Sequence, residues 1–197
     1  MNIEFVNVTK KFDKHKVLKN LTYTFEDKKT SFVMGSSGIG KTTLLRIIMG
    51  LENDYYGEVK GLEGRKISAV FQDDSLCQNS SVFLNIKLVS ELISKEKLIK
   101  DFSELGLYDI LDKRVRELSG GMKRRVAILR ALSVGFDTLI MDEPFKGLDS
   151  ENKEKVMNMV IEKTFDKTAI IVSHNIEEYL YFKKYRNIGL LNMQDSV

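Results

Sequence analysis

No stretch of this chain restricts its fold as strongly as residues 35–42, Gly-Ser-Ser-Gly-Ile-Gly-Lys-Thr. They have the pattern G-x-x-x-x-G-K-[ST], in which the glycines let consecutive backbone N–H groups turn inward around phosphate oxygens. The short apolar run Thr30–Met34 leads into this loop, and Lys41–Met49 has the apolar spacing of an amphipathic helix. A strand, a phosphate-binding loop and a helix are predicted in that order. Alone, the pattern indicates only a nucleoside triphosphate.

A second informative stretch, Thr138–Glu143, is an apolar strand that ends in two carboxylates. Sheets of the α/β class bind ligands beyond the carboxyl ends of their strands, which is where Asp142 and Glu143 would lie. Asp142 is suited to a metal ion, either directly or through water. Glu143 could polarise an attacking water as a general base. An acidic turn after a strand is common by itself, but together with the phosphate loop it indicates a hydrolytic site.

The third stretch, Ser119-Gly120-Gly121, would begin a helix that continues through Val126 and Leu129. Serine is a good N-cap, but each glycine that follows costs a helix about 1 kcal/mol relative to alanine. Such a sequence is understandable if a phosphate group must approach the bare N–H groups at the helix start. The basic run Lys123-Arg124-Arg125 is predicted to be a solvated face of the same helix.

Composition limits the class of protein. At 197 residues the chain is most simply one domain, and a net charge of +3, from 31 basic and 28 acidic residues, gives no argument for a nucleic-acid partner. The single cysteine, Cys77, fits a reducing compartment and is predicted to be a buried small side chain. No signal peptide and no run of about 18 apolar residues is found, so a membrane role would require a partner.

The apolar pattern changes along the chain. Residues 3–8 and 17–25 alternate as half-buried strands, which predicts an antiparallel start, and residues 67–71 form another strand. Residues 82–134 have helical spacing, with Leu84, Leu88 and Leu92 four residues apart. Strands at 138–141, 168–172 and 187–191 then alternate with helices at 150–164 and 176–182. This order predicts an α/β fold with a largely parallel sheet.

The Leu118-Ser119-Gly120-Gly121-Met122 stretch, between the phosphate loop and the acidic strand, decides among families with those two features. With it, the chain resembles an ATP-binding cassette (ABC) ATPase over nearly its whole length. The resemblance implies a P-loop NTPase cassette with a mainly parallel central sheet, an antiparallel N-terminal β part and an inserted helical subdomain. It implies a single domain over residues 1–197, with a RecA-like core at about 1–72 and 135–197 and the helical subdomain at about 73–134. Met122 stands where the family more often has glutamine, but the serine and glycine donors remain.

The resemblance also implies two ligands, ATP and Mg²⁺. Glu143, His174 and Lys41 would be catalytic, and Thr42, Gln72 and Asp142 would surround the metal. The residues implied to contact nucleotide are Phe12, Gly35, Ser36, Ser37, Gly38, Ile39, Gly40, Lys41, Thr42, Thr43, Ser119, Gly120, Gly121 and Asp149.

The roles of four of these residues are inferred from their positions relative to family motifs. Phe12 stands where the family stacks an aromatic ring, more often tyrosine, on adenine, although it could instead seal the first strand pair. Gln72 follows a strand where the family has a glutamine that senses Mg²⁺ and faces the membrane partner. Asp149 matches a loop aspartate that crosses the dimer interface, and it could also be a helix N-cap. His174 ends a strand at the position of the family's γ-phosphate switch histidine.

The function implied is that of an ATPase subunit that powers an ABC transporter from the cytoplasmic face of the membrane. The partners would be a second ATPase subunit, transmembrane permease subunits and, for an importer, a solute-binding protein, with no nucleic acid. The stretches Phe71–Leu76, Leu118–Ala127 and Asp142–Phe145 resemble the ATPases of nitrate, sulfonate and taurine uptake systems. The permease helix would dock near Gln72, with Phe83 and Leu84 as candidates.

Other classes stay open from the sequence. One is a soluble ABC ATPase acting on ribosomes or DNA, although such members carry two cassettes or a long coiled coil. Another is an exporter subunit of the same family. An unrelated P-loop kinase or GTPase is disfavoured by the Ser-Gly-Gly helix start and by the absence of an Asn-Lys-x-Asp stretch. A non-hydrolysing binding module is disfavoured because Lys41, Asp142, Glu143 and His174 are all present.

Overall fold

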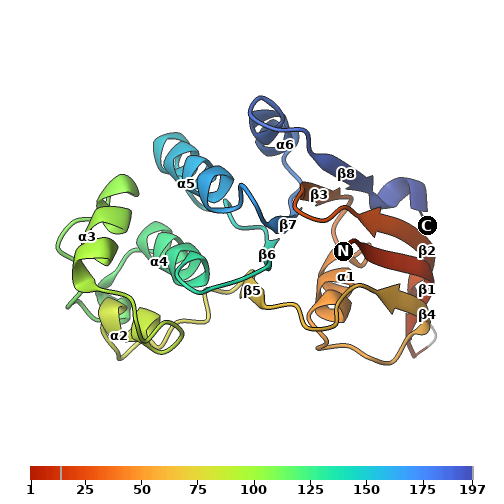
Figure 1. Cartoon of the computed structure of the whole chain (residues 1–197), viewed down its shortest axis with the longest axis horizontal. Helices are drawn as coiled ribbons and strands as arrows, with labels where there is room; N and C mark the ends of the chain where they lie inside the picture. Colours follow the sequence, from red (N-terminus) through yellow and green to blue (C-terminus); the bar gives the residue numbers. More distant parts are fainter. Residues whose placement is uncertain (14, 197) are drawn as a thin grey trace.

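A five-stranded sheet forms the centre of the protein (Figure 1). The computed structural model describes residues 1–13 and 15–196. Within this part the strands lie in the spatial order β5-β6-β7-β3-β8, and all neighbouring pairs are parallel. Their bounds are β3 (Thr30–Met34), β5 (Ile67–Val70), β6 (Thr138–Asp142), β7 (Thr168–Val172) and β8 (Gly189–Asn192). The predicted α/β fold with a largely parallel sheet is confirmed.

A separate antiparallel sheet has the order β2-β1-β4 and consists of β1 (Ile3–Phe12), β2 (His15–Phe25) and β4 (Tyr56–Lys60). The predicted antiparallel start is therefore right, but its first strand extends beyond Val8 to Phe12. The strand β4 was not predicted. Its residues are almost all exposed, so they lack the alternating apolar pattern by which strands are recognised.

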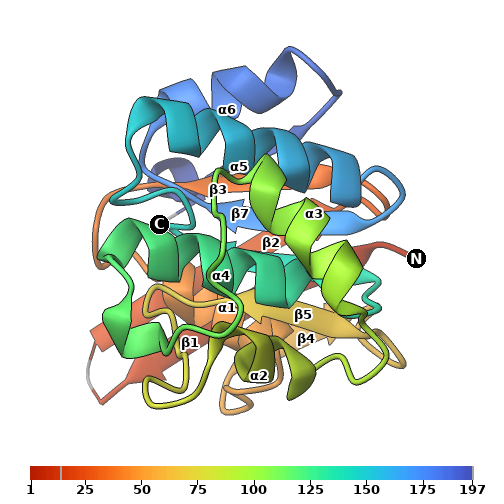
Figure 2. The ribbon, with the colours of Figure 1, turned by 90° about the vertical axis from the view of Figure 1, so that its left-hand side faces the viewer.

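Helices cover the parallel sheet, and α2 (Val82–Lys87), α3 (Lys95–Glu104) and α4 (Gly120–Leu132) lie at the end of the molecule away from β1, β2 and β4 (Figure 1). The core helices are α1 (Lys41–Ile48), α5 (Ser150–Lys163) and α6 (Ile176–Lys183). The inserted region contains α2, α3, the 3₁₀ turn η1 (Val115–Glu117) and α4, and η2 (Met193–Ser196) follows β8. In Figure 2, α4 lies between α2 and α5. None of the helices in the described residues is long and apolar enough to cross a membrane.

The apolar side chains form two cores on opposite faces of the parallel sheet. Successive residues of a strand point to opposite faces. Leu139 and Met141 accordingly belong to the core shared with α4, α5 and the helical region, whereas Ile140 between them belongs to the core under α1 and the antiparallel sheet. The helical region and the antiparallel sheet are thus fixed to the same central strands, and the loops at the strand ends lie between them.

Several sequence expectations are wrong in the inserted region. Leu84, Leu88 and Leu92, which have helical spacing, do not belong to one helix: α2 ends at Lys87, and the three side chains are 54%, 70% and 100% exposed. Cys77 is exposed in the loop before α2. Periodicity identifies a helical face but cannot say where a helix ends or whether a neighbour covers that face.

The basic run on α4 is also different from the prediction of a solvated face. Arg124 and Arg125 are 5% and 8% exposed. Each guanidinium donates to backbone carbonyls of neighbouring loops: Arg124 to Pro144 and Arg125 to Leu105. An arginine can be buried when its donors are satisfied in this way.

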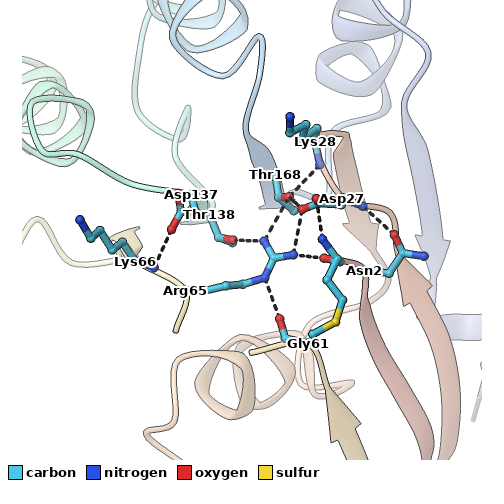
Figure 3. A network of polar contacts seen from close by, with 10 residues as sticks. Asn2, Asp27, Lys28, Gly61, Arg65, Lys66, Asp137, Thr138 and Thr168 are labelled. Carbon is cyan, nitrogen blue, oxygen red and sulfur yellow. Dashed lines mark hydrogen bonds and ion pairs between the residues drawn. The ribbon is translucent and has the colours of Figure 1, made fainter. Parts of the chain in front are cut away.

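The two sheets are joined at the amino ends of the parallel strands by Arg65 (Figure 3). Its guanidinium donates to Gly61 O at 2.7 Å, to Thr138 Oγ1 at 2.9 Å and to Asp27 Oδ1 at 2.8 Å. Thr168 Oγ1 also donates to Asp27, at 3.1 Å. Because Arg65 follows β4 while the two threonines open β6 and β7, this network holds the antiparallel sheet against the parallel one.

We expect Arg65→Met to lower the free energy of unfolding by about 2 kcal/mol, because it removes the guanidinium from Asp27 and leaves the buried Thr138 hydroxyl without its donor. Urea denaturation followed by circular dichroism would measure the loss. Lys60→Met is the control, since Lys60 pairs with Glu58 on the exposed face of β4 and surface pairs contribute little. Equal stability of the two variants would contradict the role given to Arg65.

Candidate functional site

A cavity of about 670 Å³ opens beyond the carboxyl ends of β3, β6 and β7. Thirteen of the residues implicated by the sequence line it. They come from the end of β1, the loop between β3 and α1, the first turn of α1, the loop after β5, the end of β6 with the residue that follows it, and the loop after β7. They are Phe12, Gly35, Ser36, Ser37, Gly38, Gly40, Lys41, Thr42, Thr43, Gln72, Asp142, Glu143 and His174. Segments distant in sequence therefore meet at one place, as the parallel topology requires.

The loop between β3 and α1 lines this cavity with most of its residues. Gly40, the N-cap of α1, has a φ of 107°, and a Cβ there would lie 2.8 Å from both the carbonyl oxygen and Cγ1 of Val17. Only glycine fits this contact with β2, so the residue fixes how the loop enters the helix. The result is a helix N-terminus directed at the cavity, with free N–H groups suited to an anion.

Lys41 places its ammonium group at the centre of the loop. Its Nζ donates to Gly35 O and Ser36 O, both at 2.8 Å, and the residue is only 8% exposed. These two acceptors are carbonyls of the loop itself, so the charge has no counter-ion among its hydrogen-bond partners. Such a group is well placed to bind phosphate oxygens that enter the loop.

Thr42 and Asp142 bring two hard oxygen donors together. Thr42 Oγ1 donates to Asp142 Oδ2 at 2.8 Å. Burial raises the pKa of Asp142, and the hydrogen bond from Thr42 opposes this shift. No cluster of three His, Cys, Asp or Glu residues that could hold a metal occurs in the described chain. The pair fits Mg²⁺, which takes one or two protein oxygens and completes its shell with water and phosphate.

Glu143 and His174 also line the cavity and form a close polar pair. His174 Nδ1 lies 2.9 Å from Glu143 Oε1 and 2.7 Å from Oε2. An ionised carboxylate can only accept, so the Nδ1–H of the imidazole donates and Nε2 is left for another partner. The Glu143 side chain is 16% exposed and that of His174 is 64% exposed, so the imidazole faces the cavity while the carboxylate is sheltered.

Phe12, at the end of β1, lines the cavity and is 44% exposed. The ammonium of Lys10 lies 4.6 Å from its ring centroid. Lys10 is itself held by Glu52 Oε1 at 3.0 Å and Asp54 O at 2.6 Å. A flat aromatic face braced by a cation is therefore available to a planar ring in this part of the cavity.

Five implicated residues lie outside this cavity: Ile39, Ser119, Gly120, Gly121 and Asp149. Ile39 packs against the core under α1. Ser119 caps α4 by accepting from Met122 N at 3.3 Å, and Asp149 caps α5 by accepting from Asn152 N at 2.9 Å. The N-cap prediction for Asp149 is confirmed. None of the five therefore lines the cavity of a single chain.

Two residues that line the cavity were missed. Val17 belongs to β2, and only its tertiary contact with Gly40 brings it there. Lys146 is exposed and lies three residues after Glu143 in the same loop. Its position in that loop was a signal that could have been used.

The family described as "ABC transporter" matches residues 18–146, which include the phosphate loop, the Ser-Gly-Gly helix start and the acidic strand. The chain belongs to this family. The spermidine/putrescine import ATP-binding protein PotA of Mycoplasma capricolum is 33% identical over 90% of this chain and 56% of its own length. The bicarbonate transport ATP-binding protein CmpD of Synechococcus elongatus is 31% identical over 89% of this chain and 70% of its own length. The chain thus spans a little over half of the first of these two relatives.

Solved structures agree with this membership. An ABC transporter ATP-binding protein from Pyrococcus furiosus superposes with a TM-score of 0.83 at 25% identity, covering 100% of this chain and 99% of its own. A bacterial ABC transporter cassette solved as a dimer gives 0.80 at 26% identity, covering 97% and 94%. The predicted ABC cassette fold is therefore confirmed over the whole chain.

Proposed function

We propose that this chain is the ATP-binding and ATP-hydrolysing subunit of an ABC transporter. The observation that carries the proposal is the convergence on one cavity of Lys41, the Thr42–Asp142 pair and the Glu143–His174 pair. A module that only bound nucleotide would need the first two groups. The third adds a carboxylate that can accept a proton and an imidazole that can steady a phosphate.

ATP binding would use the loop between β3 and α1. The backbone N–H groups from Gly35 to Thr43 would surround the β- and γ-phosphates, and Lys41 would exchange its two carbonyl partners for phosphate oxygens. Phe12 would stack on adenine. Thr42, Asp142 and Gln72 would hold Mg²⁺, which when bound neutralises charge on the phosphates.

Hydrolysis would use Glu143 as general base. The carboxylate would accept a proton from water as the water oxygen bonds to the γ-phosphorus and the bond to the bridging oxygen of ADP breaks. His174, in the form that carries a proton on both ring nitrogens, would donate Nδ1–H to Glu143 and Nε2–H to the γ-phosphate. The pair therefore places the base and the phosphate-binding group side by side.

A second ATPase subunit would complete the site. Ser119, Gly120, Gly121 and Asp149 do not line the chain's own cavity and lie at the starts of α4 and α5. Their donors would instead meet ATP held by the partner copy. A cassette with a TM-score of 0.77 at 28% identity was solved as a dimer in a post-hydrolysis state bound to ADP and Pi, which supports this arrangement. Closure on ATP and reopening after hydrolysis would supply the motion.

That motion would drive membrane-spanning permease subunits, with the chain bound to their cytoplasmic face. We propose import, because relatives at about the same identity are named as ATP-binding proteins for import of spermidine and putrescine and of sulfate and thiosulfate. Leu84 on α2 is 54% exposed and is a candidate contact for the permease, whereas Phe83 is half-buried against the core of the helical region.

Choice of solute would belong to the permease and, for an importer, to its solute-binding protein. The relatives PotA and CmpD, named for chemically different solutes, match this chain almost equally well. The likeness of residues 71–76, 118–127 and 142–145 to nitrate, sulfonate and taurine systems stays a prediction about the type of importer.

Affinity purification would test the proposal. Tagged Glu143→Gln chain would be recovered with Mg-ATP from detergent-solubilised membranes of its own cell, with Lys41→Ala chain as the control that cannot hold ATP. We expect a multi-spanning membrane protein in stoichiometric amount with the first variant and its depletion with the second. Recovery of ribosomes or DNA, or of no membrane protein, would contradict the transporter assignment.

A further inference from the structure

Arg124 has the most extensive set of protein contacts near the cavity, although it does not line it. It lies on α4, one turn after Gly121, and is 5% exposed. Its guanidinium has six acceptors on two loops. They are Phe71 O at 2.6 Å, Gln72 O at 3.3 Å, Asp74 Oδ1 at 3.3 Å, Asp142 O at 2.9 Å, Glu143 O at 2.8 Å and Pro144 O at 2.8 Å.

The acceptors on the two loops are bonded to different nitrogens of the guanidinium. Nη2 donates to the carbonyls of Asp142 and Glu143, and Nε to that of Pro144, so one edge of the guanidinium holds the loop after β6. Nη1 donates to the loop after β5, where Gln72 lies. One planar group thus joins the segment that carries the carboxylate base to the segment that carries Gln72.

We propose that Arg124 is a positioning residue that sets the direction of the Glu143 carboxylate and couples it to the loop of Gln72; this rests on the proposed ATPase function. Arg124 touches neither the cavity nor any reacting atom. It acts through the backbone of the two loops that do.

The backbone of Glu143 needs such support. Its φ is 50°, in the left-handed region that non-glycine residues rarely adopt. Its N–H donates to Val172 O at 3.0 Å, and its carbonyl accepts from Arg124. The residue is therefore held on both sides. This conformation directs the side chain at His174, two residues beyond Val172 at the end of β7.

The coupling follows from the shape of the guanidinium. Its donors are fixed in one plane, so a displacement of the Gln72 loop must either break the bonds from Nη1 or move the bonds from Nη2. Lysine keeps the charge but presents a single nitrogen on a flexible stem, so it cannot hold both loops at once. Arg124→Lys consequently keeps the positive charge but removes the simultaneous contacts with both loops.

Purified full-length chain with Arg124→Lys or Arg124→Gln tests the role. We expect kcat for ATP hydrolysis to fall about 10- to 100-fold, as displacement of a catalytic group by an ångström does. KM and the dissociation constant for ATP should stay within about threefold of wild type, because the phosphate loop has no bond to Arg124. A residue that merely stabilised the fold would lower the amount of nucleotide-binding protein and leave kcat per bound nucleotide unchanged.

Arg130→Lys is the matched control. Arg130 lies on the same helix and donates to Ser75 O at 2.8 Å and Asp74 O at 3.2 Å, on the Gln72 side alone. We expect its kcat to stay near that of wild type. In a double-mutant cycle under single-turnover conditions, Arg124→Lys should have little further effect once Glu143 is glutamine, since the residue acts through that carboxylate.

The outcomes are distinct. Unchanged kcat in both Arg124 variants, loss of nucleotide binding by both, or an equal loss of rate with and without Glu143 would each overturn the positioning role. A wild-type chain that binds ATP but never hydrolyses it would overturn the proposed function, and the positioning role with it.

Discussion

Glu143→Gln is expected to lower the rate of ATP hydrolysis by at least about 100-fold, the usual contribution of a general base. The amide keeps the size of the side chain and can still meet His174, but it cannot accept the proton of an attacking water. Steady-state and single-turnover release of phosphate would measure the loss. Because no bond joins Glu143 to the phosphate loop in the described structure, the affinity for ATP should change little.

The control for this variant is Glu177→Gln, which makes the same substitution at an exposed glutamate in the first turn of α6. It should hydrolyse ATP at the rate of wild type. The two variants should also differ in size-exclusion chromatography. Glu143→Gln should accumulate as an ATP-bound dimer, because closure of the dimer on ATP is no longer followed by hydrolysis. Hydrolysis at the wild-type rate would assign the base to another group.

Much of this site could be predicted because its chemistry depends on short stretches of backbone. The glycines before Lys41 and the strand that ends in Asp142 and Glu143 are local patterns, and the parallel topology brings strand ends to one edge whatever the loops between them do. The fold class followed for the same reason, since strands and helices that alternate along the chain favour a parallel sheet.

What escaped prediction depends on contacts between segments far apart in sequence. The solvated face expected at Lys123-Arg124-Arg125 is wrong because buried carbonyls of two distant loops accept from Arg124. Nothing in the spacing of α4 indicates those acceptors. The strand β4 was missed because it is an exposed edge that pairs with β1 through its backbone, and backbone pairing leaves no mark on side-chain pattern.

Lys41→Ala is expected to weaken ATP binding by about 10- to 100-fold, as loss of charge-assisted hydrogen bonds to phosphate does. The structure explains why the loss should be specific to nucleotide. Lys41 Nζ is bonded to Gly35 O and Ser36 O and forms no salt bridge in the described residues. The buried Asp142 carboxyl feels its charge but keeps the hydrogen bond from Thr42 when Lys41 is removed. Thermal stability without nucleotide should therefore fall little.

Differential scanning fluorimetry with and without Mg-ATP separates the two effects. Wild type should gain stability as ATP is added, by mass action, and Lys41→Ala should gain much less at the same concentration. Lys113→Met, at an exposed lysine of the helical region, removes the same charge away from the cavity and should keep the full response. An ATP response equal to wild type in Lys41→Ala would mean that the loop backbone alone holds the phosphates. In that case the ammonium group would serve only to order the loop through its two carbonyl bonds.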